Sequence, residues 1–137
     1  PVKPKFKPVI RYYDSVASVN TAPLEPVKMQ GVASFYSRTG CLGCDPQMIM
    51  ANGQALDDNA LTMAIPAHLV KYVGRKAKVT NPTTGLSVVV RITDTGGFYN
   101  PKYSTASGVR RVADLTIATK AAIGMKGGLG PVEWEVL

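Results

Sequence analysis

A chain of 137 residues with 45% hydrophobic content suits one compact domain with one core, and no apolar run reaches the roughly 18–20 residues that span a bilayer. The net charge is +7, from 16 Lys and Arg against 9 Asp and Glu, which indicates either a solvated basic surface or attraction to polyanions such as acidic wall polymers. The basic residues are scattered and form no recognition-helix or zinc-finger pattern, so nucleic-acid binding is not expected.

The first 29 residues differ from the rest of the chain. Prolines interrupt this segment repeatedly, and no period of apolar residues develops. We interpret residues 1–29 as an extended basic arm or a partly disordered terminus, and we predict the folded domain for 30–137. No signal-peptide pattern opens the sequence, which fits either a mature exported protein or one delivered inside a virus particle.

Short apolar runs separated by turn residues predict a mainly β domain. Strands are expected at 32–36, 61–65, 77–80, 86–92 and 132–136. The third and fourth of these flank a five-residue loop and predict a hairpin, and the last alternates Val and Trp with Glu. Many short strands with one or two small helices indicate a closed or nearly closed β-barrel.

Two helices are predicted beside these strands. The segment 114–124 begins with an acid that fits an N-cap and ends with a glycine that fits a C-cap. A second short helix is expected over 66–73. An Asn-Gly pair at 52–53 marks a turn after an apolar run at 48–51.

Cys41 and Cys44 form the one Cys-x-x-Cys motif of the chain. Such a pair makes half a zinc site, a redox motif or a local disulfide. No second pair accompanies it, and His68 is the one histidine, so a zinc site lacks ligands. No βαβ pattern surrounds the motif as a thioredoxin-like site requires. A structural disulfide or a free thiol pair is therefore favoured over a redox or a metal site; we predict the disulfide in an oxidising setting, and we expect no metal and no cofactor.

Asp94 and Asp114 each allow a structural and a functional interpretation. Asp94 follows a valine-rich strand and precedes Gly96-Gly97, so it either shapes an Asx-type turn or presents a carboxylate where glycines let a polymer approach the backbone. Asp114 either caps its helix or faces a groove. The local pattern alone favours the structural interpretation of both.

The remaining polar residues give weaker signals. Asp57, Asp58 and His68 are interpreted as surface or structural residues. Hydroxyl groups that suit hydrogen bonding to a sugar belong to Ser34, Tyr36, Thr95 and Tyr99. The chain has no Gly-x-Ser-x-Gly elbow and no Walker loop, which excludes the corresponding triad hydrolases and nucleotide triphosphatases.

An ordered series of short motifs resembles a known family. The motifs lie at 31–36, 50–54, 61–64, 79–81, 85–91, 94–98 and 111–115. Together they resemble the double-psi β-barrel domain of rare lipoprotein A, a septal lytic transglycosylase, over residues 31–137. Expansins, family 45 endoglucanases and membrane-bound lytic transglycosylase A share this barrel. The resemblance implies a six-stranded double-psi β-barrel with one or two short helices, which the extended N-terminal arm predicted for residues 1–29 would precede.

The resemblance also implies an activity. The family cleaves the glycan strand of peptidoglycan between N-acetylmuramic acid and N-acetylglucosamine, and leaves a 1,6-anhydro sugar because the muramic C6 hydroxyl attacks in place of water. The family's aspartate in Asp-x-Gly-x-Phe matches Asp94, which we predict as the general acid and base. The aspartate before the final helix matches Asp114, predicted to support or share that role. The predicted substrate contacts are Tyr36, Gln54, Thr95, Gly96, Gly97 and Tyr99.

The chain departs from the family pattern at two positions. The acid that follows Asn-Gly is Gln54 here, and the histidine that ends Leu-Thr-Ala-Ala-His is Ile65. Neither side chain carries a proton, so a non-catalytic glycan-binding module of the expansin kind and a structural virion component stay open as alternatives. Barrels with a Cys-Leu-Gly-Cys insertion also resemble those of some tailed bacteriophages, in which the arm would contact other virion proteins. The expected location is the cell envelope or a phage tail.

Overall fold

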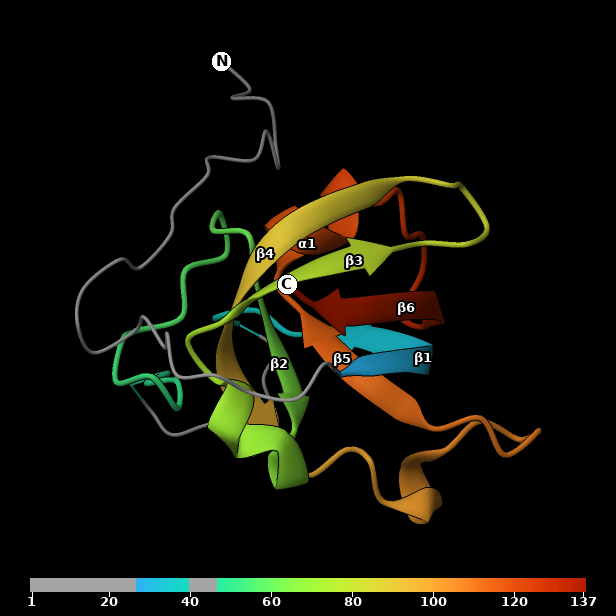
Figure 1. Ribbon diagram of the computed structural model, residues 1–137, viewed down its shortest axis with the longest axis horizontal. Helices are drawn as coiled ribbons and strands as arrows, with labels where there is room; N and C mark the ends of the chain where they lie inside the picture. The colour runs from blue at the N-terminus through green and yellow to red at the C-terminus, as the bar shows by residue number, and fades with distance from the viewer. Residues whose placement is uncertain (1–26, 40–46) are drawn as a thin grey trace.

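A computed structural model describes residues 27–39 and 47–137 (Figure 1). The strands in chain order are β1 (Lys28–Phe35), β2 (Thr62–Pro66), β3 (Lys76–Thr80), β4 (Ser87–Gly96), β5 (Arg111–Leu115) and β6 (Gly130–Val136). The helices are one α-helix, α1 (Ile117–Ala122), and two 3-10 helices, η1 (Ala67–Tyr72) and η2 (Pro101–Tyr103). In the described ranges no helix has the length and apolar character to cross a membrane.

Two sequence predictions fall largely or wholly outside the described residues. The first 26 residues of the predicted arm are not described, and neither are Cys41 and Cys44, so the disulfide stays a prediction. The barrel begins at Lys28, two residues before the expected start of the domain.

The six strands close into a barrel in the order β1-β5-β2-β4-β3-β6 (Figure 1). Two neighbouring pairs are parallel, β1 with β5 and β2 with β4, and the other four are antiparallel. Exchanging β1, β2 and β3 with β4, β5 and β6 leaves this list of pairs unchanged. The barrel is therefore built from two interlocked three-strand halves related by a pseudo-two-fold axis, which confirms the predicted double-psi β-barrel.

Inward side chains from the strands fill the barrel. The alternation predicted near the C-terminus is confirmed, because Val132 and Trp134 of β6 are buried while Glu133 and Glu135 are only partly buried. Trp134 is 1% exposed, and its indole Nε1 donates a hydrogen bond to the Val112 carbonyl oxygen at 2.8 Å. Burying this ring with its one polar group satisfied ties β6 to β5 across the core.

The predicted helix start at Asp114 is wrong. Helix α1 begins at Ile117, and Thr116 is its N-cap, with a side chain that accepts a hydrogen bond from the Thr119 backbone N–H. Asp114 instead lies in β5, which pairs with β1 on one side and β2 on the other. Strand pairing between distant segments overrides the local capping signal, because Thr116 satisfies the helix terminus equally well.

The strand end expected before Asp94 is also wrong. β4 continues to Gly96, because its second half forms a parallel pair with β2 in which Ala64 faces Asp94 and Ile65 faces Thr95. The polar sequence Thr-Asp-Thr-Gly imitates a turn, yet its backbone hydrogen bonds are supplied by the neighbouring strand. Asp94 is therefore held within a sheet and not in a free turn.

A second, smaller apolar cluster covers one face of the barrel wall. Its buried members are Tyr36, Met50, Leu56, Ala64 and Phe98. Ala64 points away from the main core, because its neighbours Met63 and Ile65 on the same strand point into it. The connection between β1 and β2 is anchored here by the Asn52 N–H, which donates to the Thr93 carbonyl oxygen at 3.0 Å.

Candidate active site

A row of four residues crosses the barrel wall at neighbouring positions of four strands. Ser34 of β1 faces Asp114 of β5, Asp114 faces Ala64 of β2, and Ala64 faces Asp94 of β4. Register partners share a face of the sheet, so the two aspartates lie on the same outer surface. They are two strands apart, which places their Cα atoms about 10 Å from one another at the usual strand spacing.

A β-bulge in each parallel pair creates this arrangement. The register passes from Val32 facing Arg111 to Ala33 facing Ala113, and from Met63 facing Ile92 to Ala64 facing Asp94. One extra residue on β5 and one on β4 reset the alternation of side chains. Residues on either side of a bulge thereby share a face that a regular strand would divide.

Asp94 is fixed by three hydrogen bonds. The Tyr36 hydroxyl donates to Oδ2 at 3.2 Å, and the Ala51 and Thr95 backbone N–H groups each donate to Oδ1 at 2.9 Å. Two of these donors come from segments far away in the sequence. The carboxylate therefore joins β4 to β1 and to the segment before β2, which is more than an Asx-type turn requires.

Asp114 is partly buried, and this burial raises its pKa from 3.8 to about 6. The hydrogen bond from Ser34 and the positive charge of Arg111 act in the opposite direction and lower the pKa, while the negative charge of Asp94 raises it. Ser34 Oγ donates to Asp114 Oδ1 at 3.1 Å. A carboxyl group in this range exchanges its proton near neutral pH, as a general acid and base must.

Arg111 is a site residue that the sequence did not indicate. Its Nε donates to Ser34 Oγ at 3.1 Å, and its Nη2 donates to the same oxygen. The guanidinium also lies 5.3 Å from the centre of the Phe98 ring. Arg111 and Asp114 are three residues apart, which places them on opposite faces of a regular strand. The bulge that brings them together leaves no mark in the sequence.

The Asn-Gly turn predicted at 52–53 is present and lies next to Asp94. Gly53 has a φ of +88°, which favours glycine. The side chain of Asn52 accepts from the Gln54 N–H at 3.0 Å and donates from Nδ2 to Gln54 Oε1 at 3.1 Å. The Gln54 amide is thereby tied to Asn52, while the Ala51 N–H one step earlier serves Asp94.

Three other positions of the family pattern, one on β2 and two glycines after Thr95, have surroundings of their own. Ile65, which stands in place of a histidine, is fully buried in the main core and faces away from the aspartates. Gly96 leaves room for Phe98, because a Cβ atom there would come within 2.7 Å of that ring. Gly97 is exposed, and a Cβ atom there would meet nothing within 4 Å. The space beside these glycines is thus partly explained by packing.

Tyr99 makes its described contacts apart from both aspartates. Its ring centre is 5.2 Å from that of His68 and 4.6 Å from the Arg110 guanidinium. No hydrogen bond from Tyr99 to either carboxylate occurs in the described part of the chain. Within residues 27–39 and 47–137, no three His, Cys, Asp or Glu side chains gather as metal ligands would.

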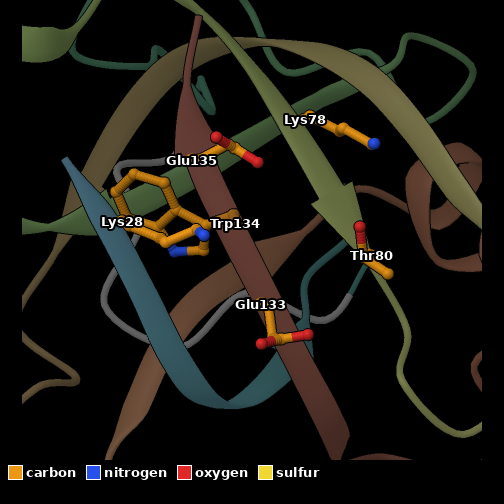
Figure 2. Close-up of a pocket in the computed structure, with 6 residues that line it drawn as sticks. All are labelled: Lys28, Lys78, Thr80, Glu133, Trp134 and Glu135. Atoms are coloured by element: carbon orange, nitrogen blue, oxygen red, sulfur yellow. The ribbon is translucent and has the colours of Figure 1, made fainter. Parts of the chain in front are cut away.

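A separate hollow of about 100 Å³ lies on the antiparallel strands β1, β6 and β3 (Figure 2). Its lining residues are Lys28, Lys78, Thr80, Glu133, Trp134 and Glu135. Figure 2 shows their side chains along β6 and its two neighbours. Glu135 faces Lys28 on one side and Lys78 on the other, so charges of opposite sign alternate across the strands. The hollow contains none of the predicted site residues and does not replace the aspartate row as the candidate site.

The fold and the row of polar residues define a double-psi β-barrel protein with two carboxyl groups on one outer surface. No protein-family model matches the chain. Over 112 residues it is 37% identical to a probable endolytic peptidoglycan transglycosylase RlpA of Nostoc sp., which covers 81% of this chain and 26% of that protein. Over 127 residues it is 37% identical to the protein of the same name from Synechocystis sp., covering 89% of this chain and 34% of that protein.

The chain is thus similar to the rare lipoprotein A proteins, and its fold is a double-psi β-barrel. It spans between a quarter and a third of the length of the curated relatives that it matches. Among solved structures, Streptomyces papain inhibitor (SPI) superposes with a TM-score of 0.50 and 20% identity, over 81% of this chain and 94% of that one. That likeness concerns the fold alone.

Proposed function

We propose that this barrel is a peptidoglycan lytic transglycosylase in which Asp114 carries the transferred proton and Asp94 is its partner. The single observation that carries the proposal is the row Ser34–Asp114–Ala64–Asp94, which places both carboxyl groups on one surface. The name of both curated relatives, probable endolytic peptidoglycan transglycosylase, supports the choice of substrate. Acting on peptidoglycan implies a location outside the cytoplasm.

The proposed reaction needs one group that donates a proton and then accepts one. Protonated Asp114 gives its proton to the glycosidic oxygen as the bond to the muramic C1 breaks. The ionised carboxylate then takes the proton of the muramic C6 hydroxyl as its oxygen bonds to C1, so no water is consumed. With a pKa of about 6, roughly one Asp114 in ten is protonated at pH 7, which is enough to start the cycle.

Asp94 has a different part in this proposal. The hydrogen bonds from Tyr36, Ala51 and Thr95 hold the carboxylate of Asp94 in one position, so that its negative charge has a fixed place. A negative charge there stabilises the positive charge that develops on the sugar ring in the transition state. It also favours the protonated form of Asp114. The acid and base role that the sequence motif suggested for Asp94 is thus proposed for Asp114.

Digestion of purified peptidoglycan tests the proposal. Wild type, Asp114→Asn, Asp94→Asn and the double variant are incubated with sacculi, and anhydromuropeptides are quantified by mass spectrometry. Glu135→Gln serves as a control, because it removes one carboxylate from the separate hollow on β1, β6 and β3. We expect product from wild type and the control, and a strong loss in both single aspartate variants. The proposal fails if wild type releases no more product than the double variant.

A binding-only module is the second candidate function. The observations that favour it are the amide of Gln54 at a family acid position, tied to Asn52, and the burial of Ile65 at the family histidine position. Retention on insoluble peptidoglycan without any anhydro product would support this alternative. Delivery by a phage tail, with residues 1–29 contacting virion proteins, is a finer proposal that electron microscopy of particles labelled for this chain would test.

A further inference from the structure

Arg111 and Ser34 form a hydrogen-bonded pair that has no role in the reaction proposed above. Arg111 sits at the start of β5, and Ser34 lies next to it on β1. Two N–H groups of one guanidinium, on Nε and Nη2, converge on the single oxygen of Ser34. The guanidinium itself is placed by the Phe98 ring, 5.3 Å from its carbon. A planar group seated on a ring with two donors aimed at one atom has little freedom to turn.

The two donors decide where the Ser34 proton points. A hydroxyl has one hydrogen to donate and two lone pairs to accept with. When Arg111 supplies both accepted hydrogen bonds, the hydroxyl hydrogen has one direction left, and Asp114 Oδ1 lies there at 3.1 Å. Oδ1 is therefore an acceptor whether Asp114 is ionised or protonated. Any proton on this carboxyl group then belongs to Oδ2.

We propose that Arg111 is a positioning residue, which acts through Ser34 to hold Oδ1 of Asp114 as an acceptor and so assigns the transferable proton to Oδ2. This inference rests on the proposed transglycosylase function for its meaning in catalysis. The charged groups that face Asp114 are Arg111 on its own strand and Asp94 on β4, while β2 contributes Ala64, which does not titrate. The Tyr36 phenol donates a hydrogen bond to Asp94 Oδ2 at 3.2 Å.

The relay predicts a specific pattern of Asp114 pKa values, measured by NMR titration of the carboxyl carbon. Removing Arg111 with Arg111→Gln raises the Asp114 pKa by about one unit, since a favourable charge and the oriented donor are both lost. Ser34→Ala also raises it. Arg111→Lys keeps the charge and loses the two-donor fork, so a relay predicts a raised pKa where a charge effect alone predicts none.

Arg110 provides a matched control. It precedes Arg111 in the sequence, and its guanidinium also lies over an aromatic ring, that of Tyr99 at 4.6 Å. Arg110→Gln therefore removes one positive charge and one ring contact close to the site without touching Ser34. We expect the Asp114 pKa to stay within about 0.3 unit of the wild-type value in this variant, a limit set by the weakness of exposed charges in water.

A double-mutant cycle separates the relay from simple charge. In the Ser34→Ala background, Arg111→Gln changes the Asp114 pKa by less than half of its effect in the wild-type background. An equal effect in both backgrounds, or an unchanged pKa in Arg111→Lys, overturns the inference. If Arg111→Gln does not fold, the Arg111→Lys and Ser34→Ala values decide the matter.

The titration also keeps this inference apart from the proposed function. The Asp114 pKa is measured without substrate, so it tests the relay even if no product ever forms. With an active enzyme, the high-pH limb of kcat/KM follows the proton on Asp114 and moves to higher pH in Arg111→Gln and not in Arg110→Gln. A change in kcat/KM without that displacement would assign Arg111 a purely structural role.

Discussion

Ionisation of Asp114 should weaken the folded barrel, and Asp114→Asn isolates the effect. Asparagine keeps the size and polarity of the side chain and removes the titration. The folded-state pKa of Asp114 is raised, so the folded chain binds this proton more tightly than the unfolded chain. The resulting stabilisation is complete below the unfolded pKa of 3.8 and is lost as the pH rises through about 6.

The size of the effect follows from the shift. A rise from 3.8 to about 6 corresponds to about 3 kcal/mol at about 1.4 kcal/mol for each pKa unit. Part of this stabilisation is already lost at pH 4. The further loss between pH 4 and 7.5 is therefore about 2–3 kcal/mol. Because burial is the main cause of the raised pKa of Asp114, salt should change the effect little.

Urea unfolding of wild type and Asp114→Asn across this pH range measures the effect. All other titrating groups are common to both chains, so the difference between the two free energies of unfolding reports Asp114. We expect wild type to lose about 2–3 kcal/mol relative to the variant between pH 4 and 7.5. A difference that stays constant within about 0.5 kcal/mol, the scatter of such extrapolations, refutes the reasoning.

Substitutions at three further positions test the site and the strands that hold it. Tyr36→Phe removes the donor to Asp94 Oδ2, and should cost at most about 1.5 kcal/mol in thermal unfolding while lowering the rate of anhydromuropeptide release about tenfold. Gly31→Ala brings a methyl group against the Arg110 carbonyl oxygen, and should lower the urea midpoint by the equivalent of about 1–3 kcal/mol. Thr116→Val deletes a buried cap that also binds two carbonyl oxygens, and should cost about 1–2 kcal/mol, whereas Thr116→Ser, which keeps the hydroxyl, should cost less.

The sequence predicted what short-range pattern determines. The alternation at 132–136 and the hairpin of 77–80 with 86–92 appear as β6 and as the β3–β4 pair, because each depends on neighbouring residues. The boundaries near Asp94 and Asp114 were misplaced, since parallel pairing with β2 and β1 sets them. Those partners are about 30 and 80 residues away, so no local signal marks them.

The candidate site also combines residues that short-range motifs indicate with residues that only the pairing of distant strands brings in. Both aspartates could be chosen from their motifs, and the described chain brings them to one surface. Arg111 could not be chosen, because a bulge in β5 turns it toward Ser34 against the strand's own period. The hydrogen bond of Tyr36 to Asp94 joins residues 58 apart in the sequence. The motifs suggested the phenol as a substrate contact and gave no sign of this carboxylate partner.

The two carboxyl groups differ in the residues that surround them. The pseudo-two-fold axis relates Ser34 to Asp94 and Asp114 to Ala64. Equivalent positions of the two halves of the barrel therefore carry different residues. A small residue at 64 leaves space over β2 for the rings of Tyr36 and Phe98.

The rings of Tyr36 and Phe98 contact different parts of the site. The Tyr36 hydroxyl donates to Asp94. The Phe98 ring instead lies against the guanidinium of Arg111, which donates to Ser34, the residue that donates to Asp114. Burial away from solvent is the main cause of the raised pKa of Asp114. One surface of the barrel thus carries a carboxylate held by hydrogen bonds and a carboxyl group whose pKa is raised by burial.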